Sequence, residues 1–313
     1  MQLFSYKFEG QIRSGRLVGL LGIDLYRAAQ SYLENFVAPA GWSKRPLSSL
    51  SDLAQLGAGG LQLVKDSTDW VLQSSQEEDA LSQKKGLVFE FDRLTVMAPI
   101  PRPGKIICIA GNYPVLENTA GPEYPTIFLK PSSGVIGDQA PIYLPRIAEN
   151  VVCEVELAVV IGKRGKDIPV NEANSIIAGY TLANDLGDRV LEKRTSQWAM
   201  GKMFDTFTPM GPIMVTPTEL RQTSNLKMFT RVNGQTVQMG NTSQMFFDVP
   251  YLISSISTLT TLEPGDVILT GSPKTIDGNP NPSYVLKPGA MVEIGIEKVC
   301  TLVNPVKSES QVK

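Results

Sequence analysis

The segment 151–160, VVCEVELAVV, places two acidic residues, Glu154 and Glu156, in a run that is otherwise apolar. Residues two apart in a strand share a face, about 6.6 Å apart. Adjacent carboxylates repel each other, and burying them calls for a compensating cation. A third acid, Asp185 in AGYTLANDLGDR, has similar surroundings. Together they indicate a site for Mg²⁺ or Mn²⁺, which prefer oxygen ligands. The alternative is an edge strand with one face in water.

Histidine is absent from all 313 residues. Mechanisms that use an imidazole of this chain as base or metal ligand are therefore excluded, among them the His-dependent serine and cysteine hydrolases and the usual zinc hydrolases. Chemistry on this chain must instead use carboxylates, lysines, tyrosines, backbone groups and an oxygen-bound metal.

The composition is that of a globular protein, with 42% hydrophobic and 19% charged residues and a net charge of -2. No basic stretch indicates a nucleic-acid partner, and no apolar run approaches the roughly 18 residues of a membrane span. The start of the chain has no secretory pattern. Cys108, Cys153 and Cys300 lie far apart, as is typical of buried free thiols in a reducing compartment. We therefore expect a soluble, cytoplasmic protein.

The pattern of elements changes along the chain. Strand-like segments at 3–10 and 14–22 precede helical spacing in 24–37 and 49–75, with Ser49 or Ser51 as a helix N-cap. A polar stretch at 75–86 follows, and beyond it come short β-branched runs interrupted by Gly and Pro. This predicts a β-dominated α+β protein: a small N-terminal α+β domain (1–80), a linker (81–94), a β-sandwich or roll (95–308) and a tail (309–313).

Several blocks together resemble the fumarylacetoacetate hydrolase family over about residues 95–308. They are, in order, KIICIAGNY, PTIFLKPSSGVIGDQAPIYLP, CEVELAVVIGKRGKDI, AGYTLANDLGDR, QWAMGKMFDTFTPMGP, VNGQTVQMGNTSQMFFDV, LEPGDVILTGSP and LKPGAMVEIGIE. The resemblance implies the mixed β-roll of that family, commonly a homodimer, and a divalent metal held by Glu154, Glu156 and Asp185. It also implies a small-molecule keto or enol substrate.

The same resemblance assigns further positions. Lys202 matches the lysine that faces the substrate beside the metal, although a lysine is more usually a solvated surface residue. Near a cation, a desolvated lysine is expected to have a lowered pKa, which suits proton transfer. Arg189 matches an arginine after the metal aspartate, and Glu192 stands where a glutamine is common. Thr270 and Gly271 in ILTGSP match a loop that contacts substrate oxygens.

The chain departs from the family at the water-activating pair. Hydrolases of the family carry a motif similar to G-x-N-Y-x-x-H-x-x-E, whereas this chain reads AGNYPVLENTAG. Leu116 therefore occupies the His position and Thr119 the Glu position. Hydrolysis needs a base to make hydroxide, worth about 10² to 10⁴ in rate, so hydrolysis is expected to suffer.

Other residues could move protons in place of the missing pair. Glu117 and Glu123 are replacement-base candidates, although acids in such a loop are more often solvated. Tyr113, Tyr124 and Lys130 are further proton carriers beside Lys202, which is favoured; Tyr113 and Lys130 are also expected to contact the substrate.

Three hypotheses follow. The first is a metal-dependent enzyme that promotes decarboxylation, isomerisation or cyclisation of a 2-oxo acid or 1,3-dicarbonyl through an enolate, because these reactions survive loss of the pair. The second is a C–C bond hydrolase of acylpyruvates or β-diketones that uses a replacement base. The third is a catalytically silent ligand-binding scaffold.

Overall fold

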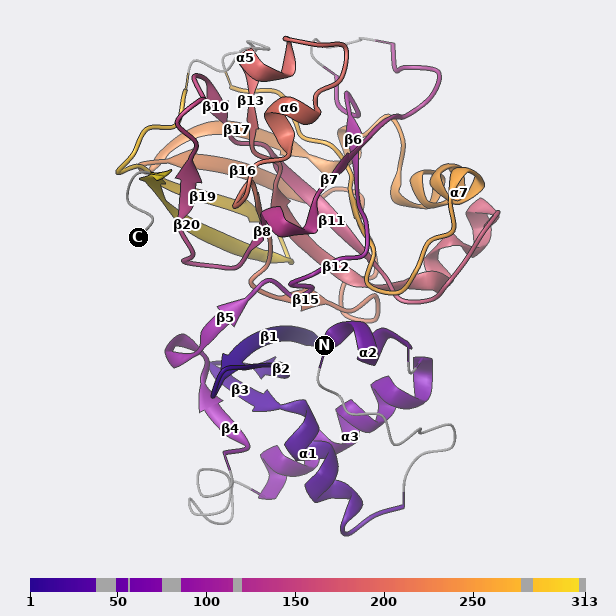
Figure 1. The fold of residues 1–313 in the computed structure, drawn as a ribbon. Helices are drawn as coiled ribbons and strands as arrows, with labels where there is room; N and C mark the ends of the chain where they lie inside the picture. The colour runs from indigo at the N-terminus through magenta and orange to yellow at the C-terminus, as the bar shows by residue number, and fades with distance from the viewer. Residues whose placement is uncertain (38–48, 56, 75–85, 115–119, 277–283, 310–313) are drawn as a thin grey trace.

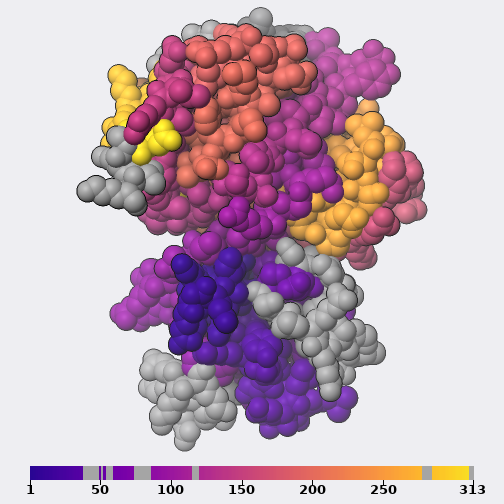
Figure 2. All heavy atoms as spheres, in the orientation of Figure 1, coloured from indigo at the N-terminus to yellow at the C-terminus, as the bar shows by residue number. Residues whose placement is uncertain are grey.

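The computed structural model describes residues 1–313 except 38–48, 56, 75–85, 115–119, 277–283 and 310–313. Figure 1 shows the elements up to β5 gathered in a lower lobe and most other strands in a larger upper lobe. The same division is visible at the surface in Figure 2. The predicted β-dominated α+β fold is confirmed.

One large sheet runs through both lobes. Its eleven strands pair mostly antiparallel, but β18 and β6 are parallel, so the sheet is mixed. In spatial order it contains β4 (Val88–Glu90), β3 (Leu21–Asp24), β2 (Gln11–Val18), β1 (Gln2–Phe8), β15 (Met214–Val215), β12 (Ile177–Asn184), β11 (Val155–Ile161), β18 (Val267–Leu269), β6 (Ile106–Ala110) and β7 (Thr126–Lys130), with β5 (Thr95–Met97) beside β1.

A second sheet of five strands and two short pairs complete the strands. The five-stranded sheet contains β17 (Gln235–Asn241), β16 (Lys227–Val232), β19 (Met291–Ile296), β20 (Cys300–Ser308) and β9 (Ile142–Leu144). The short pairs are β10 (Val151–Val152) with β13 (Gly187–Asp188), and β14 (Thr208–Pro209) with β8 (Val135–Ile136).

Helices are few and short outside the lower lobe. They are α1 (Leu25–Leu33), α2 (Leu50–Gln55), α3 (Gly57–Ser74), α5 (Arg189–Glu192), α6 (Ala199–Lys202) and α7 (Val249–Leu259), with 3₁₀ turns η1 (Phe91–Arg93), η2 (Ser132–Gly134), η3 (Val170–Ile176) and η4 (Thr242–Gln244). Side chains of Asp24 and Asp248 cap α1 and α7 by accepting hydrogen bonds from backbone N–H groups.

Strand β11 is the central strand of the upper lobe, and every residue of it is buried. Its odd residues, such as Leu157 and Val159, join a core with the five-stranded sheet. Ala158 and Val160 face a second core on the opposite side, which also contains apolar residues of the lower lobe. A strand covered on both faces reads as a continuous apolar run, so Glu156 is an exception that needs an explanation.

The predicted domain boundaries partly fall outside the described residues. Residues 81–85 of the expected linker are among these, whereas residues 88–90 form β4 by pairing with β3. Strand β20 ends at Ser308, where the expected tail begins. No helix among the described residues is both long and apolar enough to cross a bilayer.

Candidate active site

Glu154, Glu156 and Asp185 converge at one end of β11. Glu156 lies on β11, and Asp185 follows β12, its antiparallel neighbour. Glu154 was expected within the strand but lies just before β11. Its N–H donates a 3.0 Å hydrogen bond to the side chain of Asn184. The N–H of Asp185 donates 2.9 Å to the carbonyl of Glu154. One carboxylate oxygen from each acid lies within 4.8 Å of the others, the one such acidic group among the described residues.

Three cations surround these acids. The ammonium of Lys202 donates to Glu154 Oε2 at 2.6 Å and to Asp185 Oδ2 at 2.8 Å. Arg189 forms an ion pair with Glu154 through Nη2. Lys130, fully buried, donates to Asp185 Oδ1 at 2.5 Å and to two backbone carbonyls, at 3.0 and 2.7 Å. The acids are therefore held close together against their mutual repulsion.

This arrangement shifts the pKa values of Glu154 and Glu156 in opposite directions. Burial alone would raise the pKa of Glu154, but Lys202 and Arg189 outweigh burial and hold it at about 2. Burial, followed by the charges of Asp185 and Glu154, raises the pKa of Glu156 well above its ordinary value. Burial would lower the pKa of Lys202, yet the surrounding carboxylates, Asp185 first, raise it. The lowered pKa was expected for a lysine beside a cation and stays a prediction for that case, whereas the carboxylates around Lys202 act in the opposite direction.

The loop after β18 holds Glu156 in place. The N–H of Gly271 donates to Glu156 Oε2 at 2.7 Å. Gly271 has a φ of 97°, in the left-handed region that favours glycine, and a Cβ there would lie 2.8 Å from Asn112 Cβ. A larger residue at this position would therefore displace the donor that fixes Glu156.

Glu192 faces the same group of charges from α5. Its Oε2 accepts a 2.7 Å hydrogen bond from Arg189 Nη1. Its buried Oε1 has no hydrogen-bond partner among the described residues and forms an ion pair with Lys202 Nζ at 3.9 Å. A Cβ on Gly187 would collide with both Glu192 and Lys202. Glycine at this position therefore lets the two side chains approach, and it leaves one buried acidic oxygen free to accept a proton or hydrogen bond.

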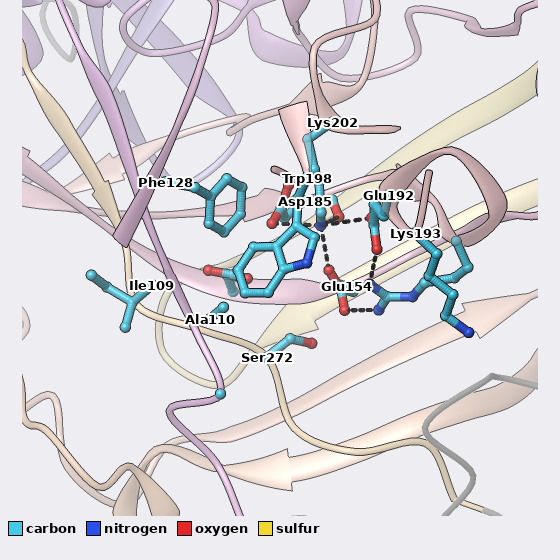
Figure 3. Close-up of a pocket in the computed structure, with 13 residues that line it drawn as sticks. Ile109, Ala110, Phe128, Glu154, Asp185, Glu192, Lys193, Trp198, Lys202 and Ser272 are labelled. Carbon is cyan, nitrogen blue, oxygen red and sulfur yellow. Dashed lines mark hydrogen bonds and ion pairs between the residues drawn. The ribbon is translucent and has the colours of Figure 1, made fainter. Parts of the chain in front are cut away.

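These groups line a pocket of about 490 Å³, a size suited to a small molecule. Figure 3 shows Lys202 beside Asp185, with Glu154 and Glu192 on one side and Ile109 and Phe128 on the other. The pocket is lined by Ile109, Ala110, Gly111, Phe128, Glu154, Glu156, Asp185, Arg189, Glu192, Lys193, Trp198, Lys202 and Ser272.

Some predicted contacts lie behind the pocket wall. The hydroxyl of Tyr113 donates to the sulfur of Met228 at 3.3 Å, and burial raises its pKa. Lys130 does not line the pocket but donates a hydrogen bond to Asp185. The hydroxyl of Thr270 donates to the carbonyl of Leu157 at 3.0 Å. Lys130 and Gly271 thus bond the acids from outside the lining, and contact of Tyr113, Lys130, Thr270 and Gly271 with substrate stays a prediction.

Of the two expected replacement bases, the structure describes Glu123, which does not line the pocket. Glu123 is exposed, Tyr124 is 70% exposed, and neither belongs to the lining. Glu117, Leu116 and Thr119 lie outside the described residues.

Sequence reasoning missed seven lining residues, which are Ile109, Ala110, Gly111, Phe128, Lys193, Trp198 and Ser272. Trp198 stands four residues before Lys202, a spacing that places both on one side of a helix. Ser272 directly follows the predicted pair Thr270 and Gly271. Either spacing could have pointed to the missed residue, whereas an aromatic residue in a β-rich run, such as Phe128, is hard to tell from core.

Residues 105–307 match the fumarylacetoacetate (FAA) hydrolase C-terminal family. The human mitochondrial oxaloacetate tautomerase FAHD2A is 42% identical over 218 residues, which cover 68% of this chain and 69% of the relative. The chain belongs to the fumarylacetoacetate hydrolase family. The mitochondrial oxaloacetate tautomerase fahd2 of Xenopus laevis is 37% identical over 262 residues, 82% of this chain and 78% of the relative.

Solved structures of family members share the fold over nearly the whole chain. The fumarylacetoacetate hydrolase of Exiguobacterium antarcticum has a TM-score of 0.78 at 28% identity, covering 99% of this chain and 100% of that one. A 5-carboxymethyl-2-hydroxymuconate delta-isomerase from Mycobacterium smegmatis has a TM-score of 0.71 at 28% identity, with the same coverage. Isomerases and hydrolases thus share this architecture.

The residues present fit a divalent metal ion. Three carboxylates supply the hard oxygen donors that Mg²⁺ and Mn²⁺ prefer. Burial and the charges of Asp185 and Glu154 raise the pKa of Glu156, so this group of acids would favour a divalent cation.

Proposed function

We propose that this chain is a divalent-metal-dependent enzyme that interconverts the keto and enol forms of a short 2-oxo acid, with oxaloacetate the first substrate to test. The observation that carries the proposal is one pocket with three converging carboxylates, the ammonium of Lys202 and the buried Oε1 of Glu192. The names of the relatives from human and Xenopus laevis support it.

Glu154, Glu156 and Asp185 would hold the Mg²⁺ or Mn²⁺. The bound ion would supply Lewis-acid polarisation of the substrate's keto group. Lys202 Nζ, which donates hydrogen bonds to Glu154 and Asp185, would donate to the developing enolate oxygen.

Glu192 is the proposed base. Its Oε1 would take the proton from the carbon between the two carbonyl groups, and that C–H electron pair would form the C=C bond of the enol. Lys202 would give a proton to the former keto oxygen. Glu192 Oε1 and Lys202 Nζ are 3.9 Å apart, so return of the proton from the acid to the amine restores both groups. No water is consumed, in keeping with the absence of histidine.

The first test measures oxaloacetate tautomerisation from the ultraviolet absorbance of the enol. Mg²⁺ or Mn²⁺ should support turnover, and EDTA should abolish it. A parallel assay follows ¹⁸O from water into the carboxylate products of acylpyruvates and should detect none. Metal-independent tautomerisation would overturn the proposal, and strong ¹⁸O incorporation would favour the hydrolase alternative. A protein that binds no divalent ion would favour the silent scaffold.

The second test replaces the base, Glu192→Gln, which keeps the shape and the hydrogen bond to Arg189. We expect kcat to fall by about 10²-fold, the usual effect of losing a positioned base, with substrate affinity nearly unchanged. Glu263→Gln, at an exposed ion pair with Arg164, is the matched control and should behave as wild type. Full activity of Glu192→Gln would exclude this base.

Decarboxylation and cyclisation, the homodimer and the cytoplasmic location stay predictions. The relatives from human and Xenopus laevis are both named as mitochondrial proteins.

A further inference from the structure

The pocket has two chemically different walls. The charged side chains occupy one, whereas Ile109, Ala110, Gly111, Phe128 and Trp198 form the other. Figure 3 shows the indole of Trp198 lying across the pocket, between Phe128 and Ile109 on one side and Glu154 on the other. A ligand held by its oxygen atoms at the charged wall would therefore meet this ring with its carbon skeleton.

The indole is fixed by its neighbours. Trp198 is the N-cap residue of α6, and Lys202 is the last residue of that helix. The ring of Phe128 meets the indole edge to face, with centroids 5.7 Å apart and an interplanar angle of 89°. Lys202 Nζ lies 5.5 Å from the centroid of Phe128. Helix α6 and the ring of Phe128 thus position both the indole of Trp198 and the ammonium of Lys202.

Trp198 remains 37% exposed although it lines the pocket. An uncovered aromatic face next to charged groups favours a ligand that is flat and conjugated, because such a ligand can stack on the ring. The keto form of a 2-oxo acid has a tetrahedral carbon next to its carbonyl. Its enol is planar across the same atoms, so the two forms differ in the property that a stacking surface detects.

We propose that Trp198 is a specificity-determining residue whose indole stacks on planar, unsaturated dicarboxylates and so favours the enol form over the keto form. This inference rests on the proposed function for its substrate class. Differential binding of a reacting species, rather than uniform binding, is what assists turnover.

The test compares four-carbon dicarboxylates whose central carbons are either tetrahedral or planar. Calorimetry on the Mg²⁺-loaded protein measures the Kd of succinate, whose central carbons are tetrahedral, and of maleate and fumarate, whose central carbons are joined by a planar double bond. The variants are Trp198→Ala and Trp198→Phe. Trp70→Phe, in α3 of the lower lobe, controls for loss of a tryptophan. Mg²⁺ affinity and thermal melting show whether each variant keeps its fold and its metal site.

The wild type should bind the better unsaturated ligand about 2- to 10-fold more tightly than succinate, the range of an aromatic stacking contact. Trp198→Ala should bring this ratio close to one, while Trp198→Phe and Trp70→Phe should keep most of it. The inference is overturned if the wild type binds none of these ligands or shows no preference, or if Trp198→Ala keeps the preference.

The outcome separates this inference from the proposed function. Turnover of oxaloacetate with an unchanged ratio in Trp198→Ala would leave the function standing and remove the role of the indole. A ratio that depends on Trp198 without tautomerisation would remove the function and leave planar dicarboxylate recognition in place.

Discussion

At the scale of single residues, the site depends on an imbalance of charge around Glu156. Among the described residues its hydrogen-bond donor is the N–H of Gly271, and after burial the charges of the acids Asp185 and Glu154 raise its pKa most. Lys202 pairs with those two acids instead. The buried carboxyl group of Glu156 therefore keeps a proton at a pH at which an ordinary glutamate has lost it.

This imbalance predicts how the ion-free protein and cation binding respond to pH. The folded pKa of Glu156 is raised, so above the ordinary value of about 4.3 the folded protein binds a proton that the unfolded chain has released. Stability without metal should fall as pH rises through that window, and Mg²⁺ affinity should rise because the ion displaces the proton. Calorimetry and thermal melting from about pH 5 to about pH 8 measure both.

Two controls accompany this measurement. Saturating Mg²⁺ should flatten the dependence of stability on pH, and Glu156→Gln should remove the contribution of this group. A Kd for Mg²⁺ that does not change with pH would contradict the assignment of the proton to Glu156.

Lys130 illustrates a residue that supports the site without lining it. It is fully buried and gives three hydrogen bonds, to Asp185, Leu186 and Phe207. Lys130→Met should lower the free energy of unfolding by about 3 to 5 kcal/mol, as for other buried pairs left with one partner. Urea denaturation checks this. Lys65→Met removes an exposed pair with Asp69 and should leave the free energy of unfolding nearly unchanged. Similar losses in both variants would refute the argument.

At the scale of elements, three loops meet at the buried side chain of Asn112. Its Nδ2 donates to the carbonyls of Phe247 (3.0 Å) and Thr270 (2.8 Å), and its Oδ1 accepts from the N–H of Phe247 (2.8 Å). Thr270 begins the loop in which Gly271 holds Glu156. Asn112 is therefore a positioning residue for the acid, although it does not line the pocket.

Asn112→Ala should weaken Mg²⁺ binding as well as the fold, because the loop that carries the donor of Gly271 loses its anchor. The loss in unfolding free energy should be about 1 to 3 kcal/mol. Asn304 is the matched control: it is buried and donates to the carbonyls of Gly137 and Ala140. Asn304→Ala should lose similar stability with Mg²⁺ affinity unchanged. Equal effects on Mg²⁺ affinity would leave Asn112 a merely structural residue.

The sequence predicted local elements better than those made by distant partners. Helices α1 and α7 carry apolar residues at helical spacing and acidic N-caps, which are local signals. Strand β4 is three residues long and exists by pairing with β3, so a short window around it could not reveal it. The acids of the site were found because charge in an apolar run is conspicuous, whereas Trp198 and Phe128 resemble core residues until the pocket is seen.

At the scale of the whole molecule, the two lobes share a sheet and a core. Strand β1 pairs with β15 at Gln2 and Leu3. One apolar cluster contains Leu3, Leu25, Leu50 and Leu53 of the lower lobe together with Ile106, Val160 and Met214 of the upper one. Continuous hydrogen bonding and shared apolar burial couple the unfolding of the two parts, whether or not residues 1–80 form a separate domain.

We therefore expect one cooperative unfolding transition, and two substitutions test it. Leu3→Ala removes a fully buried side chain from the shared cluster, and Ile23→Ala removes one from a cluster that lies within the lower lobe. Each should cost about 2 to 5 kcal/mol. Calorimetry and circular dichroism should show the same single transition moving to lower temperature in both variants, because the shared core passes the loss to the whole molecule. If the lower lobe unfolded by itself, Ile23→Ala would instead produce two transitions and shift one alone.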